Sequence, residues 1–183
     1  IKNIKEDGYL ILNKDDKFYN FHNKIASKRN LKIKSFSLKR KDATVNLNSI
    51  LKEKSRYKIS ININKIKKNF YFNSLFENDL KNLLATITII SIYKDIYKLD
   101  KNIFYEHEVT NGRWDIVKIN LFKKNFYLVD ESYNSNPLSL NSALKNFDML
   151  KIDSSRKHLV IGDMLELGKY SKKLHTQIGK SIN

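Results

Sequence analysis

The first third of the chain alternates short apolar runs with polar stretches. Residues 9–12 form an apolar run, and Asp15 and Asp16 follow it as side chains typical of turns and helix starts. A helix is predicted over about residues 17–27, and a second strand over residues 33–36. Because a helix separates the two strands, we expect them to run parallel in a βαβ unit.

Residues 43–73 change to a period of two. Apolar side chains alternate with polar ones through residues 57–64, which predicts a strand with one buried face and one solvent-facing face. Further apolar positions predict neighbouring strands, namely Val45, Leu47, Phe70 and Phe72. We expect a small antiparallel meander that covers one edge of the larger sheet.

The next segment is dominated by leucine and isoleucine. Asn78 or Asp79 is predicted to cap a helix that runs to about Tyr97 and is buried on most sides. A shorter helix is predicted over residues 101–106. Gly112 and Arg113 then form a turn before a strand of alternating pattern over residues 117–121. Arg113 is a candidate anion contact, since a guanidinium can hold phosphate oxygens through two parallel hydrogen bonds.

A dense polar cluster, Asp130-Glu131-Ser132-Tyr133-Asn134-Ser135-Asn136-Pro137, lies between an apolar run and a helix. Residues 126–129 predict a short buried strand, and Asn136 followed by Pro137 is typical of a helix N-cap and first helical position. The helix presents Leu140, Leu144 and Phe147 on one face. This order places the cluster outside the carboxyl end of a strand, where open α/β sheets bind ligands.

A second unit of the same kind follows. Residues 159–161 predict a short strand, residues 162–168 a loop, and Leu174, Ile178 and Ile182 one face of a final helix that reaches Asn183. The fold class is therefore α/β, and residues 113–183 are expected to be the start of a Rossmann-like domain.

Composition narrows the functional classes. The formal net charge of +16 would ordinarily favour nucleic acid or anionic membranes as partners. However, lysine, asparagine and isoleucine are abundant along the whole chain, and no zinc-finger, recognition-helix or aromatic RNA-binding pattern accompanies them. We interpret the charge as compositional drift, and a basic nucleic-acid-binding module remains the alternative from a different class.

The chain contains no cysteine, which excludes disulfides and thiolate metal sites. The apolar run at residues 83–93 is too short to cross a bilayer, and no secretory signal is visible. We expect a cytoplasmic protein without stable membrane insertion. The first residue is Ile1 and not methionine, so we interpret the chain as a piece of a longer protein.

Two linked motifs resemble those of the Mur ligases: the polar cluster at residues 130–137, and Gly162-Asp163-Met164-Leu165-Glu166-Leu167-Gly168 followed by His175. Three upstream segments are similar to further family motifs, namely Leu12-Asn13-Lys14-Asp15-Asp16, Asn82-Leu83-Leu84-Ala85 and Gly112-Arg113. The resemblance covers nearly the whole chain. It implies that residues 1–112 are the later part of the central ATPase domain, a mixed sheet with helices, and that residues 113–183 begin the C-terminal domain.

The resemblance also implies a reaction and its site residues. ATP would phosphorylate the terminal carboxylate of UDP-N-acetylmuramoyl-tripeptide, and D-alanyl-D-alanine would attack the acyl phosphate, with ATP and Mg²⁺ as cofactors of a monomeric intact enzyme in peptidoglycan precursor synthesis. By position, Asn82 resembles the adenine contact, Arg113 the phosphate contact, and Asp130 or Glu131 the ribose contact. Asn134 and Asn136 are expected to shape the loop or meet the substrate.

Several of these residues also have a purely structural explanation. Asn82 could bond to the helix backbone, Arg113 could form a surface ion pair, Asp130 could cap the strand end, and Asn136 could serve only as a helix cap. His175 is expected to satisfy the loop at residues 163–168 and not to act in catalysis.

The sequence departs from the family pattern in two places. Residues 76–79 read Phe-Glu-Asn-Asp where the family commonly has Gly-x-His-Asn. Gly179-Lys180-Ser181 resembles the end of a phosphate-binding loop, but Leu174 stands at the first glycine position and the triplet lies within a helix, so we interpret it as coincidence. The catalytic residues, the phosphate-binding loop, the magnesium ligands and the modified lysine are expected before Ile1, and the chain alone is not expected to catalyse the reaction.

The alternative within the family is another amino-acid-adding ligase. The turn Tyr133-Asn134-Ser135-Asn136-Pro137 argues against the diaminopimelate- or lysine-adding member, for which a Tyr-Ala-His turn is expected.

Overall fold

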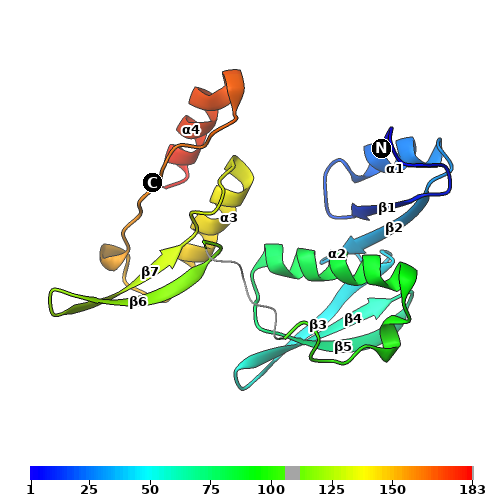
Figure 1. Cartoon of the computed structure of the whole chain (residues 1–183), viewed down its shortest axis with the longest axis horizontal. Coiled ribbons are helices and arrows are strands. Elements are labelled where there is room, and N and C mark those ends of the chain that lie inside the picture. The colour runs from blue at the N-terminus through cyan, green and yellow to red at the C-terminus, as the bar shows by residue number, and fades with distance from the viewer. Residues whose placement is uncertain (106–111, 183) are drawn as a thin grey trace. The chain divides into compact units, whose positions relative to one another are not determined.

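A computed structural model describes residues 1–105 and 112–182. The chain divides into two compact units, Ile1–His107 and Glu108–Asn183, and each is described by itself (Figure 1).

The first unit is built on a five-stranded sheet in the order β1-β2-β3-β4-β5. Its elements are β1 (Tyr9–Asn13), α1 (Tyr19–Ser27), β2 (Lys32–Ser37), β3 (Val45–Glu53), β4 (Arg56–Ile63) and β5 (Ile66–Phe72). Strands β1, β2 and β3 run parallel to their neighbours, whereas β3, β4 and β5 form the antiparallel meander. The predicted βαβ unit and meander are confirmed. The meander continues the same sheet through the β2–β3 pairing.

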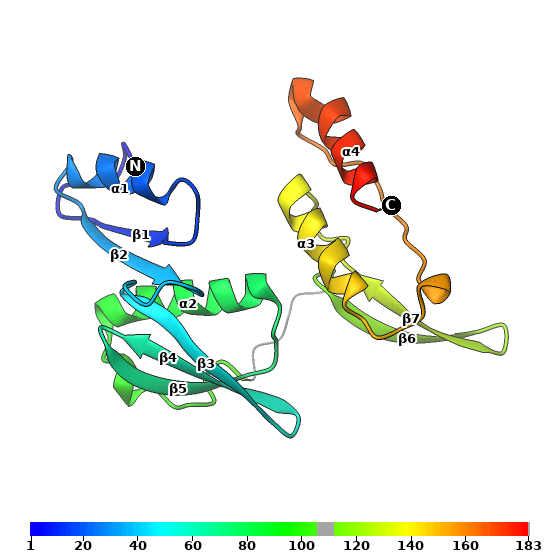
Figure 2. The same cartoon turned by 180° about the vertical axis from the view of Figure 1, so that it is seen from behind.

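The core of this unit lies between the sheet and α2 (Glu77–Tyr93), which runs along the sheet in both views (Figures 1 and 2). The alternating isoleucines of β4 and Phe70 of β5 are almost fully buried. They pack against one face of α2, formed by Leu80, Leu83, Leu84 and Ile87. The apolar face of the alternating strand and the apolar face of the helix therefore pack together in one layer.

Helix α2 differs from its prediction in three ways. It begins at Glu77 with Phe76 in the N-cap position, so neither Asn78 nor Asp79 is its cap. It ends at Tyr93 and not at Tyr97, because Lys94 is extended and the Asp95 side chain accepts the Tyr97 N–H to start a separate 3-10 turn, η1 (Ile96–Lys98). It is also buried on one face only, since Asn82 and Ile89 are exposed.

The polar face of β4 is less exposed to solvent than predicted. Ser60 is buried, and Lys58 and Asn62 are half-buried. Asn62 donates to Asn46 Oδ1 at 3.1 Å, and Asn48 donates to Ser60 Oγ at 3.4 Å. These amide and hydroxyl groups satisfy one another, which allows polar side chains to be buried.

The predicted helix at residues 101–106 is wrong for its described part. Residues 101–105 form turns, and Glu106 lies outside the described residues. The Asp100 carboxylate accepts the Asn102 N–H at 2.6 Å, and the Lys101 carbonyl accepts the Tyr71 N–H of β5 at 2.7 Å. Side-chain and strand hydrogen bonds thus take the backbone groups that a helix would use.

The second unit contains an antiparallel hairpin and two helices. Its elements are β6 (Asp115–Leu121), β7 (Lys124–Asp130), α3 (Pro137–Asp148), two 3-10 turns, η2 (Ser154–Arg156) and η3 (Gly168–Tyr170), and α4 (Ser171–Lys180). Helix α3 begins at Pro137 with Asn136 as its N-cap, as predicted, and it contacts α4.

Three expectations for this unit are wrong. The strand at residues 126–129 is not buried, since it lies in the hairpin with Tyr127 64% exposed. Residues 159–161 are not a strand: within the described residues no strand pairs with them, and Val160 is fully exposed. The last helix ends at Lys180, and Asn183 lies outside the described residues.

Candidate functional site

The turn that carries Arg113 and the polar cluster at residues 130–137 lie together at one end of the β6–β7 hairpin. Asp115 pairs with Asp130, which brings the start of β6 to the end of β7. Beyond this pair, the Tyr133 N–H donates to the Gly112 carbonyl at 3.0 Å. Gly112 has a φ of +74°, and a Cβ there would lie 3.0 Å from the Tyr133 nitrogen. Glycine therefore permits both the turn and the close approach.

Arg113 rests on an aromatic ring. Its guanidinium carbon lies 4.7 Å from the centroid of the Tyr133 ring, within the range of a cation–π contact. Among residues 1–105 and 112–182, no carboxylate forms an ion pair with Arg113, so the surface ion-pair explanation finds no partner there. The exposed side chain keeps hydrogen-bond donors for an anion.

The end of β7 carries the two acidic residues. Asp130 is half-buried and Glu131 is exposed. Asp130 Oδ1 accepts the Ser132 N–H at 3.0 Å. Hydrogen bonds from the Ser132 hydroxyl and from its backbone N–H lower the pKa of Asp130 below its ordinary value. Asp130 therefore remains an ionised acceptor next to Arg113's turn.

We expect that Ser132→Ala raises the pKa of Asp130 toward its ordinary value, because the largest stabilising hydrogen bond to the carboxylate is lost. A lowered pKa stabilises the folded state above the ordinary aspartate value, and that contribution disappears as the pH falls through the folded pKa. The ¹³C shift of the Asp130 carboxyl group, followed from pH 5 downward, measures the change.

Asp153 provides an internal control, since the Ser155 hydroxyl and N–H lower its pKa in the same way. Ser132→Ala should leave the titration of Asp153 unchanged. Identical titration of Asp130 in both proteins would disprove the role of the Ser132 hydroxyl.

Asn136 acts as a helix cap. Its Oδ1 accepts the N–H groups of Leu138 and Ser139, both at 3.0 Å, and its own N–H donates to Ser139 Oγ at 3.0 Å. This capping box uses the side-chain oxygen, so the structural explanation of Asn136 is confirmed. Asn134 is exposed in the same turn, and a substrate contact by either residue stays a prediction.

Asn82 belongs to the first unit, on the exposed face of α2, whereas the other candidate residues belong to the second unit. The structure thus joins Arg113 to residues 130–136 but leaves the contribution of Asn82 a prediction. Sequence reasoning missed Tyr133 as the platform for Arg113. No spacing rule could have found it, because the two residues are twenty positions apart and meet only through the hairpin.

His175 fixes the loop at residues 162–168, as predicted. Its Nε2 accepts the Met164 N–H at 3.0 Å, and its Nδ1 lies 2.9 Å from the Ser171 carbonyl oxygen. A carbonyl can only accept, so this geometry fits the tautomer that carries its proton on Nδ1. Asp163 Oδ1 lies 3.8 Å from Nε2. The Met164 side chain is buried beneath this contact, with 3% of its surface exposed.

We expect that His175→Ala destabilises this loop by about 1–3 kcal/mol, because the Met164 N–H loses its acceptor. Hydrogen exchange at the Met164 amide should become about tenfold faster or more. His158→Ala, at an exposed histidine of the same unit, is the matched control. Unchanged protection of Met164 in His175→Ala would contradict this account of the loop.

Within residues 1–105 and 112–182, no group of three or more His, Cys, Asp or Glu side chains could hold a metal ion. No helix in those ranges is long and apolar enough to cross a membrane.

Several known proteins are similar to this chain in sequence. Residues 1–90 match the model of the Mur ligase middle domain. The UDP-N-acetylmuramoyl-tripeptide–D-alanyl-D-alanine ligase of Buchnera aphidicola subsp. Baizongia pistaciae is 29% identical over 98% of this chain and 37% of its own length. The enzyme of the same name from Haemophilus influenzae is 41% identical over 32% of this chain and 12% of its own length.

Solved structures agree on the fold. MurF from Acinetobacter baumannii has a TM-score of 0.73 at 18% identity, covering 99% of this chain and 37% of its own. MurF from Thermotoga maritima, in complex with ADP, has a TM-score of 0.72 at 18% identity, covering 98% and 39%. The chain thus spans little more than a third of these proteins. Residues 1–90 of the chain are thus similar to the Mur ligase middle domain, and nearly its whole length is similar to a curated D-alanyl-D-alanine-adding ligase.

Proposed function

We propose that the chain is part of an ATP-dependent ligase that adds D-alanyl-D-alanine to UDP-N-acetylmuramoyl-tripeptide in peptidoglycan precursor synthesis. The observation that carries the proposal is the alignment over 98% of the chain with a relative named for that activity. In our proposal, residues 1–112 end the central ATP-binding domain and residues 113–183 begin a Rossmann-like C-terminal domain. We place the enzyme in the cytoplasm as a monomer, where ATP and the nucleotide-linked substrate are available.

The reaction we propose has two steps. The terminal carboxylate of the tripeptide attacks the γ-phosphorus of ATP and releases ADP. The amine of D-alanyl-D-alanine then attacks the acyl phosphate, loses a proton, and expels inorganic phosphate as the amide forms. Positioning and electrostatic stabilisation of the transferred phosphoryl group supply most of the catalysis in such reactions.

The second unit would contribute a nucleotide contact surface. Arg113 would hold phosphate oxygens through its free donors while Tyr133 supports the guanidinium from below. The Asp130 carboxylate, kept ionised by Ser132, or the adjacent Glu131 would accept hydrogen bonds from the ribose hydroxyls. Asn82 of the first unit would contact the adenine edge, since an amide both donates and accepts. These contacts would couple nucleotide binding to domain closure.

Magnesium would be a cofactor of the intact enzyme in this proposal. The described residues do not fit a magnesium site, since they contain no cluster of three or more potential ligands. No step is therefore assigned to the ion on these residues.

The experiment that tests the proposal measures phosphate release by the intact protein with ATP and one of three substrate pairs: UDP-N-acetylmuramoyl-tripeptide with D-alanyl-D-alanine, or UDP-N-acetylmuramoyl-dipeptide with diaminopimelate or with lysine. Release that requires D-alanyl-D-alanine supports it. Release with UDP-N-acetylmuramoyl-dipeptide plus diaminopimelate or lysine would instead assign the chain to another amino-acid-adding ligase.

A further inference from the structure

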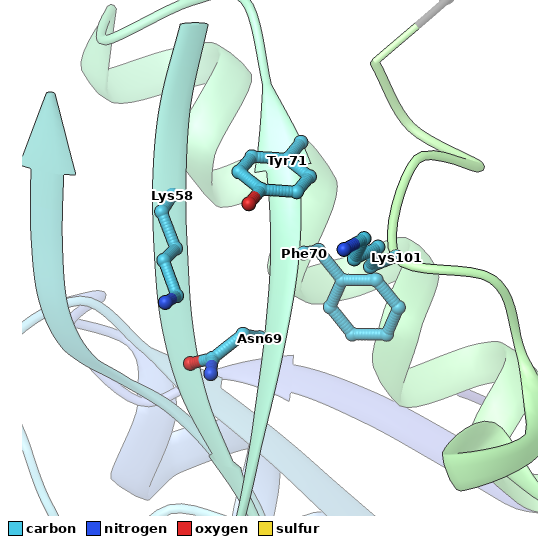
Figure 3. A pocket seen from close by; sticks show the side chains of 5 residues that line it. All are labelled: Lys58, Asn69, Phe70, Tyr71 and Lys101. Atoms are coloured by element: carbon cyan, nitrogen blue, oxygen red, sulfur yellow. The ribbon is translucent and has the colours of Figure 1, made fainter. Parts of the chain in front are cut away.

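A pocket on the first unit includes none of the candidate site residues named above. It is lined by Lys58, Asn69, Phe70, Tyr71 and Lys101 (Figure 3). Figure 3 shows Lys58 on β4 and Lys101 on the segment that follows η1. The other three residues, Asn69, Phe70 and Tyr71, lie along β5. Lys58 and Tyr71 are register partners, and Asn69 is two residues from Tyr71, so these three side chains share one face of the sheet.

Two cations, Lys58 and Lys101, line the pocket, and a third, Arg56, stacks on the Tyr71 ring. The Arg56 guanidinium carbon lies 3.5 Å from the ring centroid, and Lys101 Nζ lies 5.5 Å from it. Lys58 stands directly opposite Tyr71 on the neighbouring strand. Although Tyr71 is on the polar face, only 8% of its surface is exposed. Because the Tyr71 ring lines the pocket, stacking on it keeps the positive charge of Arg56 close to the pocket.

The backbone holds these cations in place. The Lys101 carbonyl accepts the Tyr71 N–H at 2.7 Å, which ties its segment to β5. Lys68 Nζ donates to the carbonyls of Tyr97 and Leu99 at 2.7 and 3.1 Å, and Arg56 Nη1 reaches Asn102 Oδ1 at 3.5 Å. The pocket is thus assembled from β4, β5 and a segment clamped beside them.

Within the described ranges, acidic side chains balance only one of these three positive charges, that of Lys58. Glu53 Oε1 is 3.9 Å from Lys58 Nζ, and neither Arg56 nor Lys101 forms an ion pair with any residue of 1–105 or 112–182. The nearby Asp100 carboxylate accepts the Asn102 N–H of its own turn. Like charges held together repel one another, and a bound anion would relieve that repulsion.

We propose that this pocket is a binding site for a phosphate group. The ammonium groups of Lys58 and Lys101 and the Asn69 amide line the pocket and supply donors of the kind that a tetrahedral oxyanion accepts, and the Arg56 guanidinium stacked on Tyr71 adds positive charge. The bound group is either free inorganic phosphate or the terminal phosphate of a nucleotide. This site is distinct from the contacts proposed around Arg113 and does not depend on them.

Equilibrium dialysis of the intact protein against ³²P-orthophosphate, and separately against ADP, tests the proposal. All measurements use an Arg113→Ala background, and because the nucleotide site of the intact protein can still take up either probe, the pocket is scored as an additional saturable site. Uptake at this additional site should be at least about tenfold weaker in Arg56→Gln/Lys101→Gln. Uptake should be unchanged in the control Lys65→Gln/Lys98→Gln, which removes the same charge from the exposed end of the β4–β5 hairpin and from η1.

Lys101→Glu gives a second, single-site measurement should the double variant fold poorly, and it should abolish uptake at the additional site. Uptake of orthophosphate but not ADP at this site identifies free phosphate as the ligand, and the reverse identifies a nucleotide. The proposal is overturned if the background protein shows no additional saturable site for either probe, if both double variants lose binding equally, or if Lys101→Glu binds as the background does.

Discussion

Arg113→Ala should lower D-alanyl-D-alanine-dependent phosphate release by the intact protein about tenfold or more, because a charge-assisted, two-point contact with phosphate oxygens is lost. The rate of Arg113→Lys should lie between those of the unmodified protein and Arg113→Ala, since lysine keeps the charge but lacks the planar guanidinium. Tyr133→Phe should keep nearly full activity because the ring under the guanidinium remains, whereas Tyr133→Ala should lose part of it.

Arg156→Ala is the matched control for this series. Arg156 is an exposed arginine of the same unit, in η2, and lies outside the turn at residues 130–136. Its removal should leave the rate unchanged. Full activity in Arg113→Ala, or an equal loss in Arg156→Ala, would remove Arg113 from the nucleotide site.

The largest expected effect on stability is at Phe70. This side chain is fully buried between the sheet and α2, and its ring meets that of Phe104 edge-on with centroids 5.2 Å apart. Phe70→Ala should lower the free energy of unfolding by about 3–5 kcal/mol, since both apolar burial and close packing are lost. Urea unfolding of the intact protein measures this loss of free energy, with tryptic cleavage within the first unit as the readout of the unfolded fraction.

Phe21→Ala is the corresponding surface control. Phe21 lies on α1 with 62% of its surface exposed, so its removal should change stability by no more than about 0.5 kcal/mol. Equal stability of the two variants would mean that Phe70 is not part of the core described above.

The first unit was predictable because its two periodicities are strong and mutually consistent. Alternation along β4 identified Ile59, Ile61 and Ile63 as one face, and the spacing of Leu80, Leu84 and Ile87 identified the helix that covers them. The predictions for this unit failed at the end of a helix and in the turns that follow it. Asp95 and Asp100 bind nearby backbone N–H groups, and this local competition ended α2 early and replaced the expected short helix with turns.

The second unit was harder to predict because an apolar run does not show which strand, if any, it pairs with. Residues 159–161 have the side chains of a buried strand, but a strand exists only where a neighbour supplies hydrogen bonds. The β6–β7 pairing was also invisible to local patterns. It alone brings Gly112 and Arg113 to Tyr133, so the sequence motifs identified the candidate residues without showing that an aromatic ring supports the arginine.

The central claim, amide formation through an acyl phosphate with D-alanyl-D-alanine as acceptor, is tested most directly by isotope transfer. The intact protein is incubated with ATP, D-alanyl-D-alanine and UDP-N-acetylmuramoyl-tripeptide carrying oxygen-18 in its terminal carboxylate. We predict a nucleotide-linked pentapeptide and released phosphate that carries a single oxygen-18 atom, because the attacking carboxylate oxygen stays on phosphorus when the amine displaces it. Unlabelled phosphate, or no pentapeptide, would contradict the account.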